Sequence, residues 1–242
     1  MLRGIIFDLF HTLTAAESEW GSVPWTSDAL GIPRSIWHDA LIKRSRWRLA
    51  GEVTDAVQIV RALAHSIDPS LPEERILEAA AFRQQRHRQA LTRVPPANLH
   101  LLSELRARGF QLGLLSNADA SEVSVWAESP LAGCFDAEVF SCAVGMVKPE
   151  PEIYQLCLSR LGLRPDECAF VGDGGSNELL GARQVGLYSV FFSGVMQELW
   201  PERIPGLAEV ADVHIGELQE LLSLPAISSG AALAPRIAPD AA

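Results

Sequence analysis

The chain has 242 residues, of which 48% are hydrophobic and 21% are charged, a composition typical of a globular protein. This length suffices for one large domain or for a core with a smaller inserted domain. The 30 acidic and 20 basic residues give a formal net charge of -10, which argues against nucleic acid or an anionic membrane as the main partner. A small phosphorylated molecule stays compatible with this charge, because a bound cation and a few local donors can outweigh the overall field.

The cysteines and the hydropathy pattern favour a cytoplasmic protein. Cys134, Cys142, Cys157 and Cys168 form no C-x-x-C pair and have no accompanying histidine cluster, so we expect free thiols rather than a zinc site. The chain enters a strand directly and reaches an acid at Asp8, unlike a signal peptide. Apolar runs stay well short of the ~18 residues of a membrane span. The sequence does not indicate an oligomeric state.

The N-terminal part of the chain combines one short strand with a long helical segment. Residues 2–7 form an apolar run that predicts a buried strand. Residues 15–92 have a helical pattern, with helices expected over 35–50 and 72–91. Acids open the second of these helices and arginines close it, as the helix dipole favours. We expect the tryptophans and basic residues between 37 and 48 mainly to pack this segment, with one or two of them facing a substrate.

From residue 93 onward, helices and strands alternate. The expected helices cover 97–108, 150–161 and 176–185, and the expected strands cover 111–116, 137–142, 168–172, 188–192 and 211–215. Alternation of this kind predicts an α/β fold with a parallel sheet wrapped by helices. Residues 226–242 are rich in Ala, Pro, Ser and Gly and are expected to be disordered. The predicted organisation is a core of residues 1–14 and 93–225, an inserted helical domain of residues 15–92, and a tail.

Four polar motifs lie at the ends of the expected strands or just before a helix. They contain Asp8, Ser116 with Asn117, Lys148, and Asp173. Because the carboxyl ends of parallel strands meet at one edge of a sheet, these residues should converge on one crevice. Each motif alone is weak, since aspartate at a strand end and a Ser-Asn pair are ordinary turn residues. Their combination in this order is what indicates a site.

These residue types suit the transfer of an anionic group. The carboxylate of Asp8 can attack phosphorus or carbon and form a covalent intermediate. A second carboxylate, Asp173, cannot lie beside it without a cation, and two carboxylates with backbone and water oxygens suit Mg²⁺. The hydroxyl of Ser116 and the amide of Asn117 can donate to an anion, and Lys148 adds a positive charge.

The four motifs resemble those of the haloacid dehalogenase superfamily of hydrolases. They are FDLFHTL at residues 7–13, LLSN at 114–117, VKPEPEIY at 147–154 and FVGDGGSNELLGAR at 170–183. The resemblance covers the chain to about residue 220 and implies a Rossmann-like core with an inserted helical cap. Residues 15–92 match that cap in position and character.

The resemblance also implies a role for each motif. Asp8 would be the nucleophile, Ser116 and Asn117 would bind the transferred group, and Lys148 would steady the intermediate. Mg²⁺ would be held by Asp8, by Asp173 and by the backbone carbonyl of Phe10, a ligand that needs no particular side chain.

Phe10 departs from the phosphatases of this family, which carry aspartate two residues after the nucleophile. That aspartate protonates the leaving group and then activates water; its loss typically costs ~10²–10⁴ in rate, and less for an acyl or aryl phosphate. The family's dehalogenases carry an aromatic residue here, because halide leaves unprotonated. They also carry serine where this chain has Asp173 and asparagine where it has Gly175, and they need no metal. Glu178 stands where aspartate is commoner in the metal-binding version.

Residues Phe10, His11 and Asn117 are the expected contacts to the substrate. His11 could act as acid or base because histidine titrates near neutrality, but we favour a place at the cap interface or in the turn. The sequence thus predicts a magnesium-dependent phosphatase that acts on a small phosphorylated metabolite through an aspartyl-phosphate at Asp8. The alternatives are a metal-free 2-haloacid dehalogenase with an ester intermediate at Asp8, and a pseudoenzyme that binds a phosphorylated ligand with little turnover.

Overall fold

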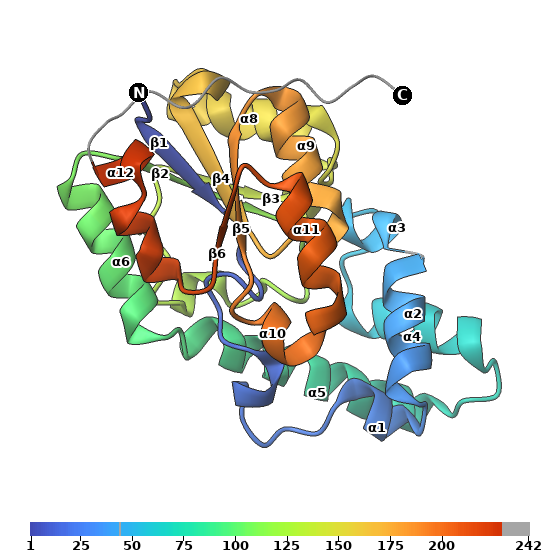
Figure 1. The fold of residues 1–242 in the computed structure, drawn as a ribbon. Coiled ribbons are helices and arrows are strands. Elements are labelled where there is room, and N and C mark those ends of the chain that lie inside the picture. Colours follow the sequence, from blue (N-terminus) through green and yellow to red (C-terminus); the bar gives the residue numbers. More distant parts are fainter. Residues whose placement is uncertain (44, 229–242) are drawn as a thin grey trace.

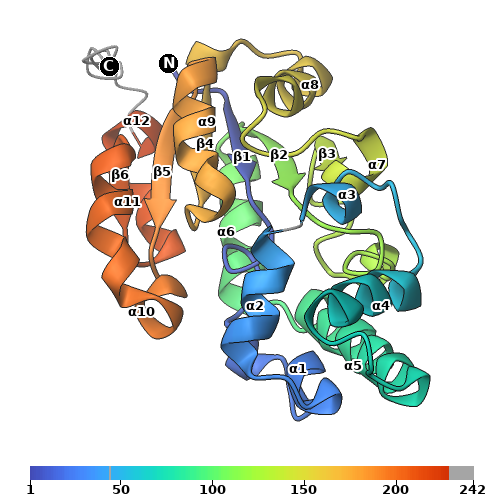
Figure 2. The ribbon, with the colours of Figure 1, turned by 90° about the vertical axis from the view of Figure 1, so that its right-hand side faces the viewer.

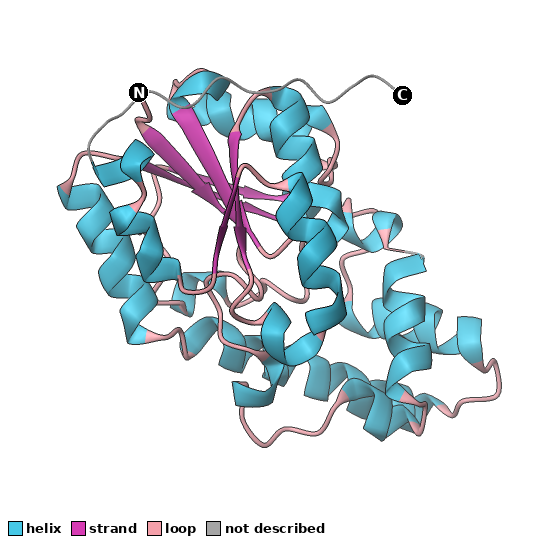
Figure 3. Ribbon diagram, viewed as in Figure 1, coloured by secondary structure: helices cyan, strands magenta, loops and turns pink. Residues whose placement is uncertain are grey.

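The computed structural model describes residues 1–43 and 45–228, which fold around a six-stranded sheet (Figures 1 and 3). The strands are β1 (Gly4–Phe7), β2 (Gln111–Ser116), β3 (Ala137–Phe140), β4 (Cys168–Gly172), β5 (Tyr188–Phe192) and β6 (Val213–Ile215). Their order is β3-β2-β1-β4-β5-β6, and every neighbouring pair is parallel. The predicted α/β fold with a parallel sheet is confirmed.

The strand order places a crevice beside β1. The chain builds outward from β1 through β2 to β3, then returns to β4 on the other side of β1 and continues to β6. In open α/β sheets, ligands bind where the strand order reverses, outside the carboxyl ends of the strands. Asp8, Ser116 and Asp173 lie at the carboxyl ends of β1, β2 and β4, so the fold brings these three motifs to one edge.

Helices cover both faces of the sheet. Successive side chains of a strand point to opposite faces, so Ile5 and Phe7 pack in one hydrophobic cluster and Ile6 packs in another. The first cluster includes side chains of α6 (Pro96–Ala107) and α12 (Pro225–Ser228), and the second includes those of α8 (Pro151–Leu161) and α9 (Glu178–Val185). Burial on both faces explains why the strand sequences are almost continuously apolar.

Residues 15–92 form a helical segment with a hydrophobic cluster of its own (Figure 2). Its helices are α1 (Thr26–Leu30), α2 (Arg34–Lys43), α3 (Arg46–Leu49), α4 (Ala56–Ile67) and α5 (Glu73–Thr92). Asp55 caps α4 by accepting a hydrogen bond from the amide of Gln58 at 2.8 Å. The helical character expected for this segment is present, but two helices, α2 and α3, stand where one was expected. Its status as a separate cap domain stays a prediction.

Three short helices complete the core: α7 (Ser141–Val144), α10 (Met196–Leu199) and α11 (Ile204–Val210). The strand expected over 137–142 therefore ends at Phe140, where α7 begins. The expectation of a disordered tail from residue 226 is wrong for its first three residues, because Ala226 and Ile227 are buried in α12 against the sheet. Residues 229–242 lie outside the described residues. Among the described helices, none combines the length and the apolarity that a membrane crossing requires.

Candidate active site

Asp8 is the first residue after β1, and the sheet fixes its position. Its backbone amide donates to the carbonyl of Val171 in β4 at 2.9 Å, which continues the ladder beyond the strand. The next residues turn sharply, and the amides of Thr12, Leu13 and Thr14 all donate to the carbonyl of Leu9. This turn brings the Thr12 hydroxyl to within 3.3 Å of the Asp8 Oδ2 atom. The nucleophile predicted from the sequence is thus a buried carboxylate at the edge of the sheet.

Lys148 bridges two buried carboxylates. Its Nζ atom lies 2.5 Å from Oδ1 of Asp8 and 2.5 Å from Oε2 of Glu178. Burial would lower the pKa of Lys148, but the two carboxylates outweigh burial and raise that pKa above its usual range. The ammonium group therefore stays charged, and its donors orient both carboxylates.

Asp173 and Glu178 flank a glycine turn that joins β4 to α9. The amide of Gly175 donates to Oδ1 of Asp173 at 2.8 Å, and the amide of Gly174 donates to Oε1 of Glu178 at 3.0 Å. A Cβ atom at Gly172 would clash with the Glu178 carboxylate. Glycine at this position therefore lets the Glu178 side chain reach the end of the strand.

Asp8, Asp173 and Glu178 form a cluster that fits a divalent cation. One oxygen of each lies within 4.8 Å of the others. Lys148 pairs with Asp8 and Glu178, and His11 lies against Asp173. Burial and the neighbouring acids raise the pKa values of Asp8 and Glu178 in spite of Lys148. The donor set consists of carboxylate oxygens, the ligands that Mg²⁺ prefers. A hard cation here would offset the excess negative charge.

Ser116 and Asn117 at the end of β2 differ in how their side chains are used. The Ser116 hydroxyl is buried and has no hydrogen-bond partner among the described residues. Buried polar atoms are almost always paired, so this hydroxyl is available to a ligand. The Asn117 side chain instead donates to the carbonyl of Lys148 at 3.0 Å and accepts from its amide at 2.8 Å. Asn117 therefore holds the Lys148 loop against β2, and its contact with substrate stays a prediction.

Phe10 and His11 face the helical segment. The ring of Phe10 lies 6.0 Å from that of Trp20 and 5.4 Å from that of His87. His11 has a φ of +61° and stacks on Trp20 at 5.9 Å. These contacts place both residues at the interface between the core and the helical segment, the position that we favour for His11 from the sequence. Their contact with substrate stays a prediction.

The charge state of His11 is set by two carboxylates. Its ring nitrogens lie 3.6 Å from Asp173 and 3.4 Å from Glu17. Burial alone would lower the pKa of His11, but these two acids outweigh burial and raise the pKa to about 10. With this pKa the imidazole is a cation near neutrality, and it neutralises part of the charge of the acidic cluster.

A second buried cluster joins the helical segment to the loop after β2. Nη1 of Arg48 in α3 lies 2.9 Å from Oδ2 of Asp119, and Nη2 of Arg83 in α5 lies 2.8 Å from the same oxygen. Glu122 accepts from both arginines. Burial would raise the pKa of Asp119, but Arg83 and Arg48 hold it below its usual range. This four-residue cluster, which we call the Asp119 cluster, ties α3 and α5 to the loop that carries Asn117.

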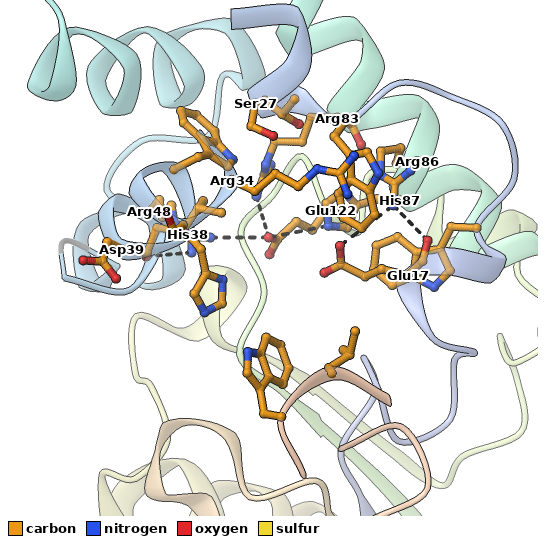
Figure 4. A pocket seen from close by; sticks show the side chains of 18 residues that line it. Glu17, Ser27, Arg34, His38, Asp39, Arg48, Arg83, Arg86, His87 and Glu122 are labelled. Atoms are coloured by element: carbon orange, nitrogen blue, oxygen red, sulfur yellow. Dashed lines mark hydrogen bonds and ion pairs between the residues drawn. The ribbon is translucent and has the colours of Figure 1, made fainter. Parts of the chain in front are cut away.

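A cavity of about 460 Å³ lies between the helical segment and the core (Figure 4). Most of its walls come from the helical segment, and the core contributes Glu122, Leu199 and Trp200. Trp20 and Trp200 line the cavity and contact the ring of His11. The cavity therefore adjoins the loop of residues 8–14 after β1, called the nucleophile loop after its predicted nucleophile Asp8. Among the described tryptophans, lysines and arginines between 37 and 48, Trp37 and Arg48 line the cavity. That one or two of these residues face a substrate stays a prediction.

Comparison with protein families supports the resemblance seen in the motifs. The model for haloacid dehalogenase-like hydrolases matches residues 2–186. The chain belongs to this family. The haloacid dehalogenase-like match spans the nucleophile loop, the helical segment and the motifs of Ser116, Lys148 and Asp173, and it confirms the resemblance to this superfamily.

Curated relatives of the chain include several phosphatases. It is 32% identical over 152 residues to a phosphoserine phosphatase of Thermus thermophilus, which covers 62% of this chain and 57% of that protein. It is 26% identical over 243 residues to a glyceraldehyde 3-phosphate phosphatase of Methanocaldococcus jannaschii, which covers 93% and 97%. The match to bifunctional epoxide hydrolase 2 of Rattus norvegicus covers 36% of that protein. The alignments thus cover little more than half of the phosphoserine phosphatase and about a third of the epoxide hydrolase.

Solved structures with the same fold include both dehalogenases and phosphatases. The L-2-haloacid dehalogenase of Xanthobacter autotrophicus aligns with a TM-score of 0.64 at 21% identity, covering 93% of this chain and 98% of that one. A HAD phosphatase from Thermococcus onnurineus aligns with a TM-score of 0.61 at 21% identity, covering 93% and 99%. At these identities the likeness establishes the fold and does not distinguish the two chemistries.

Two features of this region are not evident from the sequence. Glu178 was noted only as a replacement for a commoner aspartate, whereas the structure makes it the second partner of Lys148. Its place five residues after Asp173, at the start of a helix, was the available signal. The Asp119 cluster was missed entirely. Arg48 and Asp119 are 71 positions apart, and only the packing of the helical segment on the core brings them together.

Proposed function

We propose that the protein is a magnesium-dependent phosphatase that hydrolyses a small phosphate monoester through an aspartyl-phosphate at Asp8. The observation that carries this proposal is the buried cluster of Asp8, Asp173 and Glu178, in which Lys148 pairs with two carboxylates and His11 lies against the third. Three buried carboxylates keep an excess of negative charge beside these two groups, so the cluster fits a cation better than a metal-free site. The phosphatase names among the curated relatives point in the same direction.

The proposed reaction has two displacements at phosphorus. A carboxylate oxygen of Asp8 attacks the phosphorus, the ester P–O bond breaks, and the leaving oxygen takes its proton from water because Phe10 has none to give. Water then attacks the phosphorus of the acyl phosphate, which releases inorganic phosphate and restores the Asp8 carboxylate. Lys148 holds Asp8 in place, and the unpartnered Ser116 hydroxyl donates to a phosphate oxygen. Mg²⁺ held by the acidic cluster would supply positive charge against the phosphate oxygens.

A 2-haloacid dehalogenase is the second candidate, and Phe10 is the observation that favours it. Halide needs no proton when it leaves, so an aromatic residue at this position is compatible with an ester intermediate at Asp8. Asp173 and Glu178 argue against this chemistry, because they place two further carboxylates beside the proposed nucleophile.

A cytoplasmic location is also part of the proposal, and the four free cysteines support it.

Hydrolysis of acetyl phosphate tests the proposal, because this small acyl phosphate has a leaving group that needs little protonation. We expect phosphate release with Mg²⁺, no release with a chelator, and loss of activity in Asp8→Asn. Asp166→Asn is the matched control, since Asp166 is an exposed carboxylate that pairs with Arg164 at the surface. Chloride release from 2-chloropropionate in the presence of chelator, without hydrolysis of acetyl phosphate, would replace the phosphatase by the dehalogenase. Binding of phosphate esters without either turnover would favour the pseudoenzyme.

A further inference from the structure

The walls of the cavity are unusually rich in planar rings. Six of the lining side chains are tryptophans or histidines: Trp20, Trp25, Trp37, His38, His87 and Trp200. Leu41 and Leu199 are the aliphatic side chains among the described lining residues. Flat aromatic walls favour a flat ligand, because stacked and edge-to-face ring pairs gain energy beyond the area that they bury.

The buried arginines of the cavity already have partners. Arg48 and Arg83 pair with Asp119 and Glu122 in the Asp119 cluster. A second anionic group, such as the carboxylate of phosphoserine or of a 2-haloacid, would have to compete with these buried acids for the two guanidinium groups. Removing an arginine from a buried carboxylate is strongly unfavourable.

The two remaining arginines are committed in other ways. Arg86 donates to the carbonyls of Val23 and Glu17, and its guanidinium lies 3.8 Å from the ring centre of Trp25. Arg34 pairs with Asp28 and lies 4.4 Å from the same ring. Both guanidinium groups thus lie against the Trp25 ring, which fixes one wall of the cavity. The cavity therefore offers ordered rings, and its buried arginines all have partners among the described residues.

We propose that this cavity binds a neutral aromatic ring on the part of the substrate that is not transferred, an inference that rests on the proposed phosphatase function. The cavity volume of about 460 Å³ falls within the range of small-molecule sites. Trp20 connects the cavity to the site, since it contacts both Phe10 and His11 of the nucleophile loop. The buried Nε of Arg48, which has no hydrogen-bond partner among the described residues, can donate to an oxygen substituent on the ring.

The chemistry of the leaving group agrees with this occupant. A phenol has a pKa of roughly 10, as the tyrosine side chain shows, whereas unactivated water has a pKa of about 15.7 and alkoxides are comparably poor leaving groups. A phenoxide therefore leaves with much less protonation than an alkoxide. Phe10 removes the acid that an alkyl phosphate needs, so an aryl phosphate is the ester that both the cavity and the nucleophile loop can accept.

Phosphonates separate ring binding from leaving-group chemistry, because their C–P bond is not cleaved. We would compare 1-naphthylmethylphosphonate, butylphosphonate and 3-phosphonopropionate as competitive inhibitors of acetyl phosphate hydrolysis with Mg²⁺. The expected inhibition constant for the naphthyl compound is roughly tenfold below those of the other two, as two stacked ring contacts would give. A carboxylate-bearing phosphonate that binds as tightly as the naphthyl compound would overturn the proposal.

Variants of the cavity walls test the same preference. Trp25→Leu and Trp200→Leu should each reduce the ratio between the butyl and naphthyl inhibition constants by roughly threefold to tenfold. Trp126→Leu is the matched control, because Trp126 packs against Phe135 and Phe140 outside the cavity. An unchanged ratio in both cavity variants, with thermal unfolding like that of the control, would contradict the inference.

Failure of the proposed function would be visible separately. If acetyl phosphate is not hydrolysed, the phosphatase proposal fails, and calorimetric titration of the same three phosphonates in the presence of Mg²⁺ still measures the preference for a ring. If the naphthyl compound binds roughly tenfold more tightly than the other two, the aromatic site is supported without the activity. Equal affinities of the three phosphonates would contradict the aromatic site as well as the phosphatase function.

Discussion

Replacing Asp119 by asparagine should destabilise the protein strongly, although the two side chains have nearly the same shape. The Asp119 carboxylate is fully buried and accepts hydrogen bonds from Arg48, Arg83 and Ser121. Asparagine removes the negative charge and leaves two buried guanidinium groups with Glu122 as their remaining acidic partner. Breaking a buried ion pair from one side typically costs about 3–5 kcal/mol, because an uncompensated charge stays buried.

A loss of this size can be measured by thermal unfolding. For chains of this length, 1 kcal/mol corresponds to roughly 2–4 °C in Tm, so Asp119→Asn should lower Tm by about 6–20 °C at neutral pH. Glu128→Gln is the control, because Glu128 pairs with Arg88 on the surface with both side chains about half exposed. An exposed pair of this kind contributes about 1 kcal/mol or less. A decrease for Asp119→Asn no larger than that for Glu128→Gln would refute the reasoning.

The same prediction has a definite pH dependence. The arginines hold the folded-state pKa of Asp119 below its unfolded value of 3.8. The stabilisation is therefore fully present above pH 3.8 and is lost as the pH falls through the lower folded-state pKa. The Tm difference between wild type and Asp119→Asn should stay constant from neutral pH down to about pH 3.8 and shrink at lower pH.

Three further predictions concern the nucleophile loop and the acidic cluster. Phe10→Asp should raise the turnover of ethyl phosphate by ~10²-fold or more and change that of acetyl phosphate far less; equal changes in phosphate release from both substrates would contradict the role assigned to the missing acid. Glu178→Gln should weaken Mg²⁺ binding at least about tenfold by calorimetry, whereas Asp166→Asn should leave it unaltered. The folded-state pKa of His11 is raised to about 10 from 6.5, so without divalent cations its contribution is complete below pH 6.5 and is lost toward pH 10; wild type should lose stability relative to His11→Asn across this interval, and a constant Tm difference would be the contrary result. Asparagine is suitable because it tolerates the positive φ at this position.

The sheet was predictable from the sequence because its strands are buried on both faces. The strands expected over 111–116, 168–172 and 188–192 match β2, β4 and β5 residue for residue. Each is a short apolar run bounded by turn residues or followed by a polar motif, a pattern that leaves few alternatives. The convergence of Asp8, Ser116, Lys148 and Asp173 follows from the same parallel topology, and the structure brings these motifs to one edge.

The helical segment was less predictable because some of its side chains pack in its own hydrophobic cluster and also line the cavity or contact the core. Trp37 is buried in the hydrophobic cluster of this segment and also lines the cavity, so its periodicity does not reveal which role it has. Arg83 looked like a late basic residue that completes a helix dipole, yet it is buried against Asp119. Contacts over such sequence distances depend on how the segment packs on the core, and local patterns do not record that.

Phe10 and the cavity both bear on the leaving group of the proposed substrate. Phe10 contributes no proton, and its ring contacts Trp20 and His87, both of which line the cavity. The residue that removes the general acid thus also extends the aromatic wall toward the nucleophile. An alkyl phosphate would meet this site without an acid for its leaving group and without a group that recognises its chain. An aryl phosphate needs less protonation and can stack on the rings, so one substitution in the nucleophile loop serves both the leaving group and its binding.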